Sequence, residues 1–357
     1  MNMTSRVAIP ALPPGFLTFW QPFPAEEGPG GERLRAECTA WAQRFNIGGN
    51  AEQAMVYGAV AAALVTHVLP HTPSPIKRPL ADYLGWGWFA NDLAMPTTPN
   101  VSLADCVRAM SRFARMTHSP RVWQDDGNPA EAPFQEVLPR LRAALSDAQF
   151  HLLMRTLESW LFNMLWETAL RDRGTPPGVN EYLAMRYGSG GLDVMVPLVC
   201  IAEEVEPYLA TFGSPLVVAA SEAGFLTAAI DNDRYSYFKE VALGQRKYNL
   251  AKALQADDPD LGFEEAWRQA IVMRDQLLAL YLRLRDKALA TAGPAMHGYF
   301  SGVDRSIAGN MPFCITALRY LDAKAANTVR VTADRPAHAV SDRVPPYPTV
   351  TQWADLL

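Results

Sequence analysis

The sequence predicts an all-α protein built as one large helical domain, and three observations support this. Apolar residues recur with a 3.6-residue period in long windows, alternation with period 2 is nearly absent, and Pro or Gly clusters separate the windows. The 357 residues are 49% hydrophobic and 19% charged, which is enough apolar material for one large core. No linker divides the chain into halves of different composition.

The predicted helices follow one another along most of the chain. The windows with helical period are Arg33–Asn46, Ala54–Val68, Leu103–Met116, Pro133–Ala144, Asp147–Arg173, Pro215–Leu243, Glu264–Ala290 and Ser301–Leu321. The breaks that hold Pro, Gly or Asp clusters are Pro70–Pro79, Gly174–Gly178, Gly188–Gly191 and Asp257–Gly262.

Both ends of the chain differ in composition from the helical windows. Residues Val7–Phe23 are rich in Pro and aromatic side chains, and we expect them to pack across the helices. Residues 326–357 are polar and rich in Pro, so we expect a flexible C-terminal tail outside a domain that covers residues 1–325.

Composition also restricts the environment and the partners. A net charge of −5 argues against a nucleic acid or an anionic membrane as partner. The scattered cysteines, without a CxxC pair, and a start without a signal pattern predict a cytoplasmic protein. The longest apolar stretch, Ala54–Leu69, is too short and too weak for a membrane span. Whether the protein forms a homodimer stays open.

The strongest chemical feature lies between Asn232 and Glu240. Asn232, Ser236 and Glu240 are four residues apart, so a helix places them one above another on one face. Their amide, hydroxyl and carboxylate oxygens suit Mg²⁺, which keeps several waters and takes further ligands from phosphate. A solvated polar helix face would hold the same three residue types. These residues alone therefore leave both interpretations open.

The segment Asn232–Glu240 resembles the second metal motif of the bacterial class I terpene synthases, N-D-x-x-S-x-x-K-E. The match holds at every fixed position of the motif, which are Asn232, Asp233, Ser236, Lys239 and Glu240. The resemblance implies a single-domain class I terpenoid synthase α-helical bundle. It further implies that Asn232, Ser236 and Glu240 bind one of three Mg²⁺ ions, and that Lys239 contacts the diphosphate.

Two more segments stand in the order that this family shows. Glu181–Arg186 resembles the diphosphate-sensing segment, with Arg186 as the sensor. Ser189 and Gly190 resemble the linker and effector of a helix break that reorganises when substrate binds. A glycine suits that place, because a carbonyl that points into a pocket requires an unwound helix. Taken alone, an arginine is more often an ordinary ion-pair partner.

The C-terminal part carries a third such segment. Gly309-Asn310, followed by Arg319 and Tyr320, resembles the C-terminal diphosphate clamp of the family. An Arg-Tyr pair alone means nothing, so the interpretation depends on the joint order of all these segments. Together they imply that Arg186, Lys239, Arg319 and Tyr320 bind the substrate diphosphate.

The first metal motif departs from the family pattern of an Asp pair and a later acid. Counting from Trp86 places Asn91 and Asp92 on the two Asp positions and Met95 on the acid. A second register, shifted by one residue, places Asp92 on the first Asp position. We prefer the first register because it keeps more of the flanking aromatics. In both registers Asp92 is the only carboxylate, and an Asn oxygen is a poorer ligand for Mg²⁺.

Two other acidic pairs have a structural interpretation. Asp125-Asp126 and Asp257-Asp258 each stand beside Gly or Pro in a predicted loop. Asp residues in such places cap helices and form turns. We therefore do not assign metal binding to either pair.

The resemblance implies a class I terpene cyclase that ionises a prenyl diphosphate with Mg²⁺, cyclises the carbocation and releases diphosphate. Trp88, Phe89 and Phe313 are candidates to face the cation, because aromatic faces stabilise positive charge. Gly87 stands where relatives often carry a Phe, and a missing ring would deepen the cavity. We therefore expect the C20 substrate, geranylgeranyl diphosphate, and a cyclic diterpene.

Two alternatives remain open at this point. A chain-elongating prenyltransferase shares the helical fold, but it would carry two Asp-rich motifs, and Asn232–Glu240 stands in place of the second. A catalytically degraded protein that only binds prenyl diphosphates is the other alternative, because the first metal motif has lost carboxylates.

Overall fold

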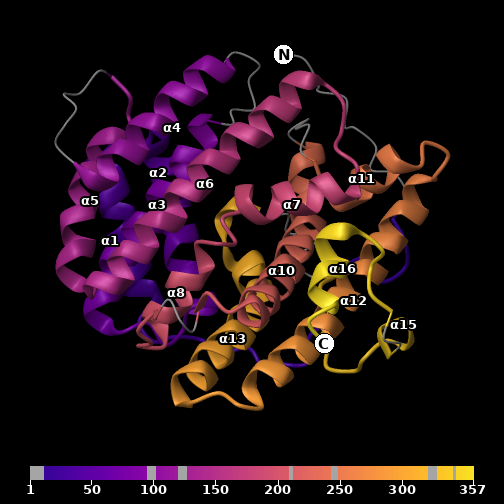
Figure 1. Cartoon of the computed structure of the whole chain (residues 1–357). Helices are drawn as coiled ribbons and strands as arrows, with labels where there is room; N and C mark the ends of the chain where they lie inside the picture. The colour runs from indigo at the N-terminus through magenta and orange to yellow at the C-terminus, as the bar shows by residue number, and fades with distance from the viewer. Residues whose placement is uncertain are drawn as a thin grey trace.

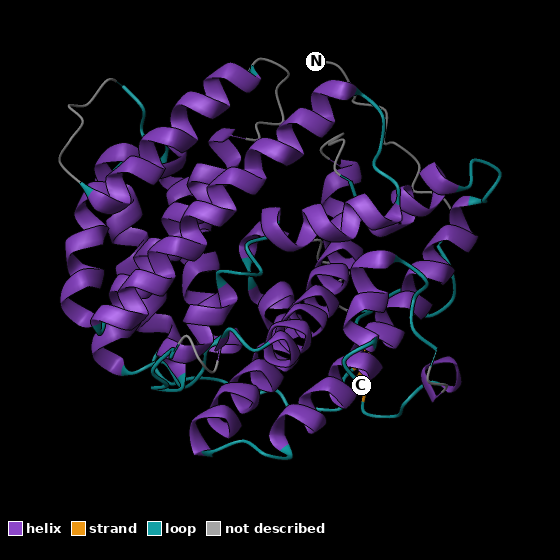
Figure 2. Ribbon diagram, in the orientation of Figure 1, coloured by secondary structure: helices purple, strands orange, loops and turns teal. Residues whose placement is uncertain are grey.

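Helices make up almost all of the regular structure, as the sequence predicted (Figure 2). The computed structural model describes residues 12–94, 102–119, 127–208, 212–242, 248–320, 328–340 and 343–357. Met95 and Asp125-Asp126, which the sequence singled out, lie outside these ranges, and so does the side chain of Tyr320. The all-α fold class is confirmed.

The longer helices form two groups (Figure 1). One side holds α1 (Gly31–Arg44), α2 (Ala51–Ala63), α3 (Ser74–Ala94), α4 (Leu103–His118) and α5 (Glu131–Ala144). The other side holds α10 (Pro215–Ala242), α11 (Leu250–Asp257), α12 (Phe263–Leu289) and α13 (Pro294–Thr316). The connecting helices are α6 (Asp147–Arg173), α7 (Val179–Ser189) and α8 (Met195–Ala202).

Short elements complete the fold. They are the 3₁₀ helices η1 (Ile47–Gly49) and η3 (Leu318–Tyr320), the π-helical turn η2 (Leu64–Val68), the helices α15 (Ala337–Val340) and α16 (Pro348–Ala354), and the strands β1 (Thr18–Trp20) and β2 (Arg330–Thr332). The two strands pair in parallel, with Phe19 opposite Val331. This strand pairing holds the N-terminal segment against the C-terminal segment.

Local sequence signals explain several helix ends. A capping box at Ser146 and Gln149 starts α6, and Gly174 ends it with φ 74°, a conformation that favours glycine. None of the predicted helical windows covers α3, which begins at Ser74 inside the expected break. Pro75 lies in its first turn, where the missing N–H has no helical partner to lose. Pro79 is tolerated inside the helix.

The contact between α13 and η2 depends on a glycine. A Cβ atom on Gly309 would lie 1.8 Å from the carbonyl oxygen of His67, so only glycine permits this approach. Close by, the Ser306 hydroxyl donates to the carbonyl of Val68 at 3.0 Å. Gly309, expected to belong to a diphosphate clamp, is therefore a packing residue that brings α13 against the π-helical turn.

The described part of the C-terminal segment, which we expected to be a flexible tail, packs on the helices. Ala339, Val350 and Trp353 are buried. Helix α16 contacts α10 and α7, and Figure 1 shows it beside α10. The overall polarity of the segment hid these few apolar side chains, which are sufficient to hold it on the helices.

A buried charge network holds the N-terminal segment on α10. The Arg274 guanidinium donates to both carboxylate oxygens of Asp231, at 2.8 and 2.6 Å. Arg274 also donates to the carbonyl of Trp20 at 2.7 Å, and Arg234 donates to the carbonyl of Phe16 at 2.5 Å. Asp231, Arg234 and Arg274 are all buried. The network therefore ties α12 and the N-terminal segment to α10.

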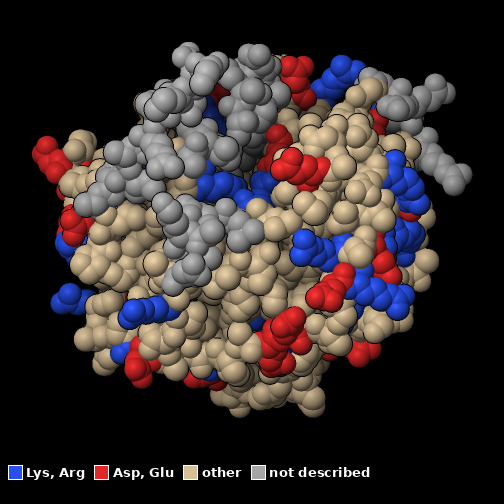
Figure 3. Space-filling view, turned by 180° about the vertical axis from the view of Figure 1, so that it is seen from behind, with Lys and Arg blue, Asp and Glu red and all other residues tan. Residues whose placement is uncertain are grey.

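The surface agrees with the small net charge. On the face drawn in Figure 3, acidic and basic side chains are interspersed among other residues. Within the described ranges, every helix is too short or too polar to cross a membrane.

Candidate functional site

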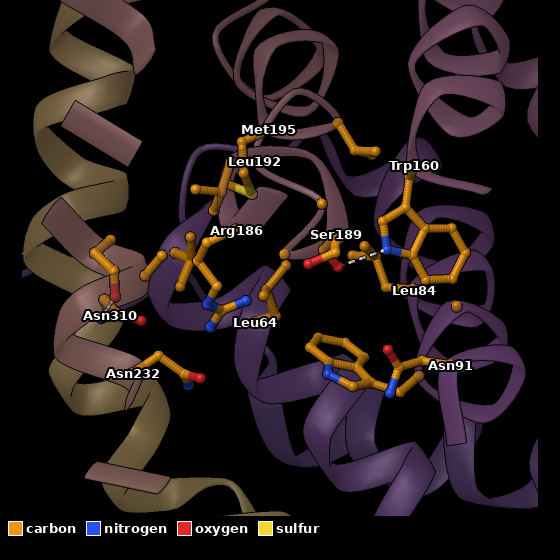
Figure 4. Close-up of a pocket in the computed structure, with 18 of the residues that line it drawn as sticks. Leu64, Leu84, Asn91, Trp160, Arg186, Ser189, Leu192, Met195, Asn232 and Asn310 are labelled. Atoms are coloured by element: carbon orange, nitrogen blue, oxygen red, sulfur yellow. Dashed lines mark hydrogen bonds between the residues drawn. The ribbon is translucent and has the colours of Figure 1, made fainter. Parts of the chain in front are cut away.

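A cavity of about 270 Å³ lies between the two groups of helices. Its walls come from η2, α3, α6, α7, α10 and α13. Figure 4 shows Asn232 and Asn310 on one side of it, Asn91 and Trp160 on the other, and the Arg186 side chain reaching between them. Leu64, Leu84, Leu192 and Met195 supply apolar wall. The cavity thus combines a polar group of residues with an apolar lining.

One face of α10 carries oxygen ligands into the cavity. Asn232, Ser236 and Glu240 all line it, one helical turn apart. The Ser236 hydroxyl donates to the Glu240 carboxylate at 2.7 Å. Adjacent ligands on a Mg²⁺ ion bound at 2.0–2.1 Å are about 3 Å apart, so this oxygen pair fits such an ion. Lys239 lines the cavity beside them.

A hydrogen-bonded network joins α7 to the same part of α10. Arg186 lines the cavity, and its guanidinium contacts the Asp233 carboxylate at 2.9 Å. The Tyr182 hydroxyl donates to the other oxygen of Asp233. Burial opposes the charge on Arg186, but Asp233 and Tyr182 more than offset this, so the pKa of Arg186 is raised. The Arg186 guanidinium therefore stays charged in the wall of the cavity.

Opposing effects act on the pKa of the Asp233 carboxyl group. Burial raises the pKa of Asp233 to about 6, against the opposing effects of Arg186 and Tyr182. Sequence reasoning gave Asp233 and Tyr182 no role, although Asp233 stands inside the matched motif. Tyr182 and Arg186 are one turn apart on a helix, and this spacing is the sequence signal that could have indicated a shared partner.

The predicted helix break lies at the end of α7. Gly191 has φ 70°, which favours glycine. A Cβ atom on Gly190 would lie 2.6 Å from both Nη1 and the carbonyl oxygen of Arg186. The Ser189 carbonyl accepts a hydrogen bond from the indole N–H of Trp160 at 3.1 Å, drawn dashed in Figure 4. No sequence signal pointed to Trp160, because its partner lies on another helix.

On α3, Asn91 lines the cavity, whereas Asp92 does not. The Arg319 guanidinium binds both oxygens of Asp92, with Nη2 at 2.5 Å from Oδ1. The Tyr57 hydroxyl donates to Asp92 at 2.7 Å. The surviving carboxylate of the first motif thus lies beside the cavity, held by an arginine that itself lines the cavity.

Two of the three predicted aromatics line the cavity. Trp88 and Phe313 both line it, with ring centroids 5.9 Å apart. Phe89, which we expected to face the cation, does not line it. It is buried and packs edge-on against Tyr57, with centroids 5.6 Å apart. A rotation of about 100° per residue turns the residue after Trp88 away from the cavity.

The second acidic pair has the structural place that we predicted. The Asp257 carboxylate accepts the backbone N–H of Val179 at 3.0 Å. It thereby caps the start of α7, where a negative charge also complements the helix dipole.

Comparisons with known proteins show which family this chain resembles. Residues 82–279, more than half of the chain, match the family described as terpene synthase family 2, C-terminal metal binding. The diterpene cyclase DtcycB of a Streptomyces species is 29% identical over 87% of this chain and 89% of its own length. A 4-epi-cubebol synthase of Streptosporangium roseum, which cyclises farnesyl diphosphate, is 25% identical over 85% of this chain and 91% of its own length.

Solved structures share the fold. The SVS_A2 protein, obtained by ancestral sequence reconstruction, superimposes with a TM-score of 0.79 at 22% identity, covering 95% of this chain and 99% of its own. A linalool/nerolidol synthase of Streptomyces clavuligerus does so with a TM-score of 0.71 at 18% identity, covering 82% of this chain and 99% of its own.

Proposed function

This chain belongs to the bacterial class I terpene synthases, which are lyases that act on prenyl diphosphates, and we propose that it cyclises a C20 prenyl diphosphate with the help of Mg²⁺. The single observation that supports this best is that the oxygen-bearing side chains of Asn232, Ser236 and Glu240 line one cavity together with apolar residues. Asn91 lines the cavity across from this face, and Asp92 next to it would supply a carboxylate once Arg319 releases it.

The cationic residues would bind the leaving group. Arg186, Lys239 and Arg319 all line the cavity and would hold the diphosphate oxygens, with Tyr320 as a further donor. Bound Mg²⁺ would supply additional positive charge that stabilises the departing diphosphate. Trp88 and Phe313 would face the resulting carbocation in a cavity that excludes water.

The helix break would couple binding to ionisation. In this structure Arg186 contacts Asp233, and the Ser189 carbonyl accepts the Trp160 indole N–H. A bound diphosphate would compete with Asp233 for the Arg186 guanidinium, because both are anions. Movement of Arg186 would then shift Ser189 and Gly190, which lie three and four residues further on, at the end of α7.

We infer the C20 chain length from the room beside Gly87. Gly87 lines the cavity, and a Cβ atom added to it would meet no atom within 4 Å. The names of the relatives leave the choice open, because one is a diterpene cyclase and another cyclises farnesyl diphosphate.

We expect Gly87→Phe to lose most C20 turnover while it keeps C15 turnover. The new ring would fill the open space beside Gly87, and the longer chain needs that space most. Steady-state kinetics with geranylgeranyl and farnesyl diphosphate measure this directly. Gly262→Phe is the control, because Gly262 also has open space around it but does not line the cavity. Equal losses on both chain lengths would show that Gly87 does not set substrate size.

We expect Asp92→Asn to be far more damaging than Asn91→Ala, because Asp92 carries the only negative charge of the first motif. We also expect Asn91→Asp to lower the Mg²⁺ concentration for half-maximal rate by about tenfold, which corresponds to about 1.4 kcal/mol. Titration of the rate with Mg²⁺ measures both. An unchanged Mg²⁺ requirement in Asn91→Asp would contradict this account of the altered motif.

Release of diphosphate separates the proposed function from its alternatives. We expect the wild-type protein to release diphosphate from geranylgeranyl diphosphate alone, and only with Mg²⁺. A protein that merely binds prenyl diphosphates would release none. A chain-elongating prenyltransferase would require isopentenyl diphosphate as a second substrate.

A further inference from the structure

Tyr83 is a polar residue of the cavity that neither the metal site nor the diphosphate site uses. Its side chain lines the cavity, and its exposed fraction is 3%. Its ring stacks on Trp86, with centroids 6.0 Å apart. Among the described residues, none forms a hydrogen bond with the Tyr83 hydroxyl. The Tyr83 oxygen is not wholly enclosed by protein atoms, so a molecule in the cavity can reach it and form a hydrogen bond with it.

Two polar side chains of α13 that line the cavity are already engaged. Ser306 donates to the carbonyl of Val68 at 3.0 Å, and Asn310 donates to the carbonyl of Ala228 at 3.0 Å. The Ser306 hydroxyl hydrogen and one of the two Asn310 amide hydrogens are therefore directed at the backbone. The Tyr83 hydroxyl has no such partner, so its O–H bond can rotate to suit a bound molecule.

Helix α3 places Tyr83 at the end of the cavity away from the metal motif. Tyr83, Gly87 and Asn91 are four residues apart, so they form one stripe, and all three line the cavity. At 1.5 Å per residue, Tyr83 lies about 12 Å along the helix from Asn91. Gly87 between them has no side chain, and the space next to it is open. A substrate chain that starts at the metal motif can therefore reach Tyr83.

The phenol is uncharged under working conditions. Burial, and then the negative charge of Asp193, raises the pKa of the Tyr83 hydroxyl. A neutral hydroxyl in an apolar cavity acts as a dipole, and its effect on a nearby charge is stronger there than in water.

We propose that the Tyr83 hydroxyl is a product-determining catalytic group, which turns its oxygen towards the carbocation and selects the cyclic cation that proceeds to product. This rests on the proposed function. The aromatic wall offers its ring faces to a cation over a broad area, whereas one oxygen atom stabilises positive charge at one place. The hydroxyl therefore favours the cation whose charge lies next to it, and it has no part in the departure of diphosphate at the other end of the cavity.

Tyr83→Phe tests this, because it removes only the hydroxyl and keeps the ring that stacks on Trp86. We expect the ratio of the main product to the other hydrocarbons to change by about tenfold, as for a hydrogen bond to a charged group. The rate of diphosphate release should stay within about twofold of wild type. Tyr299→Phe is the matched control, since that buried phenol hydrogen-bonds Ser221 at 2.8 Å and does not line the cavity.

Each outcome of this experiment decides the proposal. An unchanged product mixture in Tyr83→Phe overturns it, and so does an equal change in Tyr299→Phe, which would point to packing. A large loss of diphosphate release in Tyr83→Phe also overturns it, because the hydroxyl would then act in ionisation. Failure of the proposed function shows separately, as absence of diphosphate release from the wild-type protein, and it removes the present inference as well.

Discussion

The Glu240→Gln enzyme is expected to release diphosphate about 10³-fold more slowly than the wild type, a loss of about 4 kcal/mol of transition-state stabilisation. Glu240 supplies the only carboxylate among the three oxygen ligands that α10 presents to the cavity. Gln keeps the shape of the side chain but removes its charge, and a neutral amide binds Mg²⁺ less tightly. A comparable loss is expected for Asn232→Ala. Initial rates at saturating Mg²⁺ measure both effects.

Glu222→Gln is the matched control for Glu240→Gln. Glu222 lies on the same helix, and it does not line the cavity. We expect this variant to keep its rate within about twofold of wild type. Far-ultraviolet circular dichroism of all variants should show an intact helical fold. A wild-type rate in Glu240→Gln would contradict the assignment of the metal site.

The Asp231→Asn protein is expected to lose about 3–5 kcal/mol of its free energy of unfolding. Asp231 accepts hydrogen bonds from Nε and Nη2 of Arg274, and it is also paired with Arg234. All three side chains are buried. A neutral amide would leave two buried guanidinium groups without their shared anion. Urea unfolding, followed by circular dichroism, measures the change.

Glu264→Gln provides the comparison for Asp231→Asn. Glu264 pairs with Arg268 at 3.0 Å within one helix, as Asp231 does with Arg234, but about half of each side chain is exposed. Such pairs contribute at most about 0.5 kcal/mol, so we expect little change in stability. A loss below about 1 kcal/mol in Asp231→Asn would show that the buried network does not hold the N-terminal segment on α10.

Helical periodicity predicted the fold class and most long helices, but two kinds of helix escaped it. Helix α3 starts among prolines, inside the segment Pro70–Pro79 that we predicted to be a break. Helix α8 (Met195–Ala202) is buried over most of its surface, so its sequence shows no polar face and no period. Trp353 shows a third limit, because two or three apolar residues in a polar segment do not reveal whether a groove exists for them.

The candidate site was predictable where its residues share one helix. The spacing of Asn232, Ser236 and Glu240 placed them on one face of α10, and the structure has them there. Contacts between helices could not be predicted in this way. The hydrogen bond from Trp160 to Ser189 and the empty surroundings of Gly87 depend on how α6, α7 and α3 pack, which no local pattern encodes. Phe89 differs, because the helical rotation per residue is enough to turn it away from the face that holds Trp88.

The most direct test of the central claim is to incubate the protein with C10, C15 and C20 prenyl diphosphates, with Mg²⁺ and with a chelator, and to analyse the hydrocarbon extract by gas chromatography and mass spectrometry. The proposed function predicts a cyclic C20 hydrocarbon from geranylgeranyl diphosphate, present with Mg²⁺ and absent with the chelator. A cyclic product from the C15 substrate alone would overturn the inferred chain length and keep the metal-dependent cyclase. No hydrocarbon from any of the three substrates would contradict the central claim.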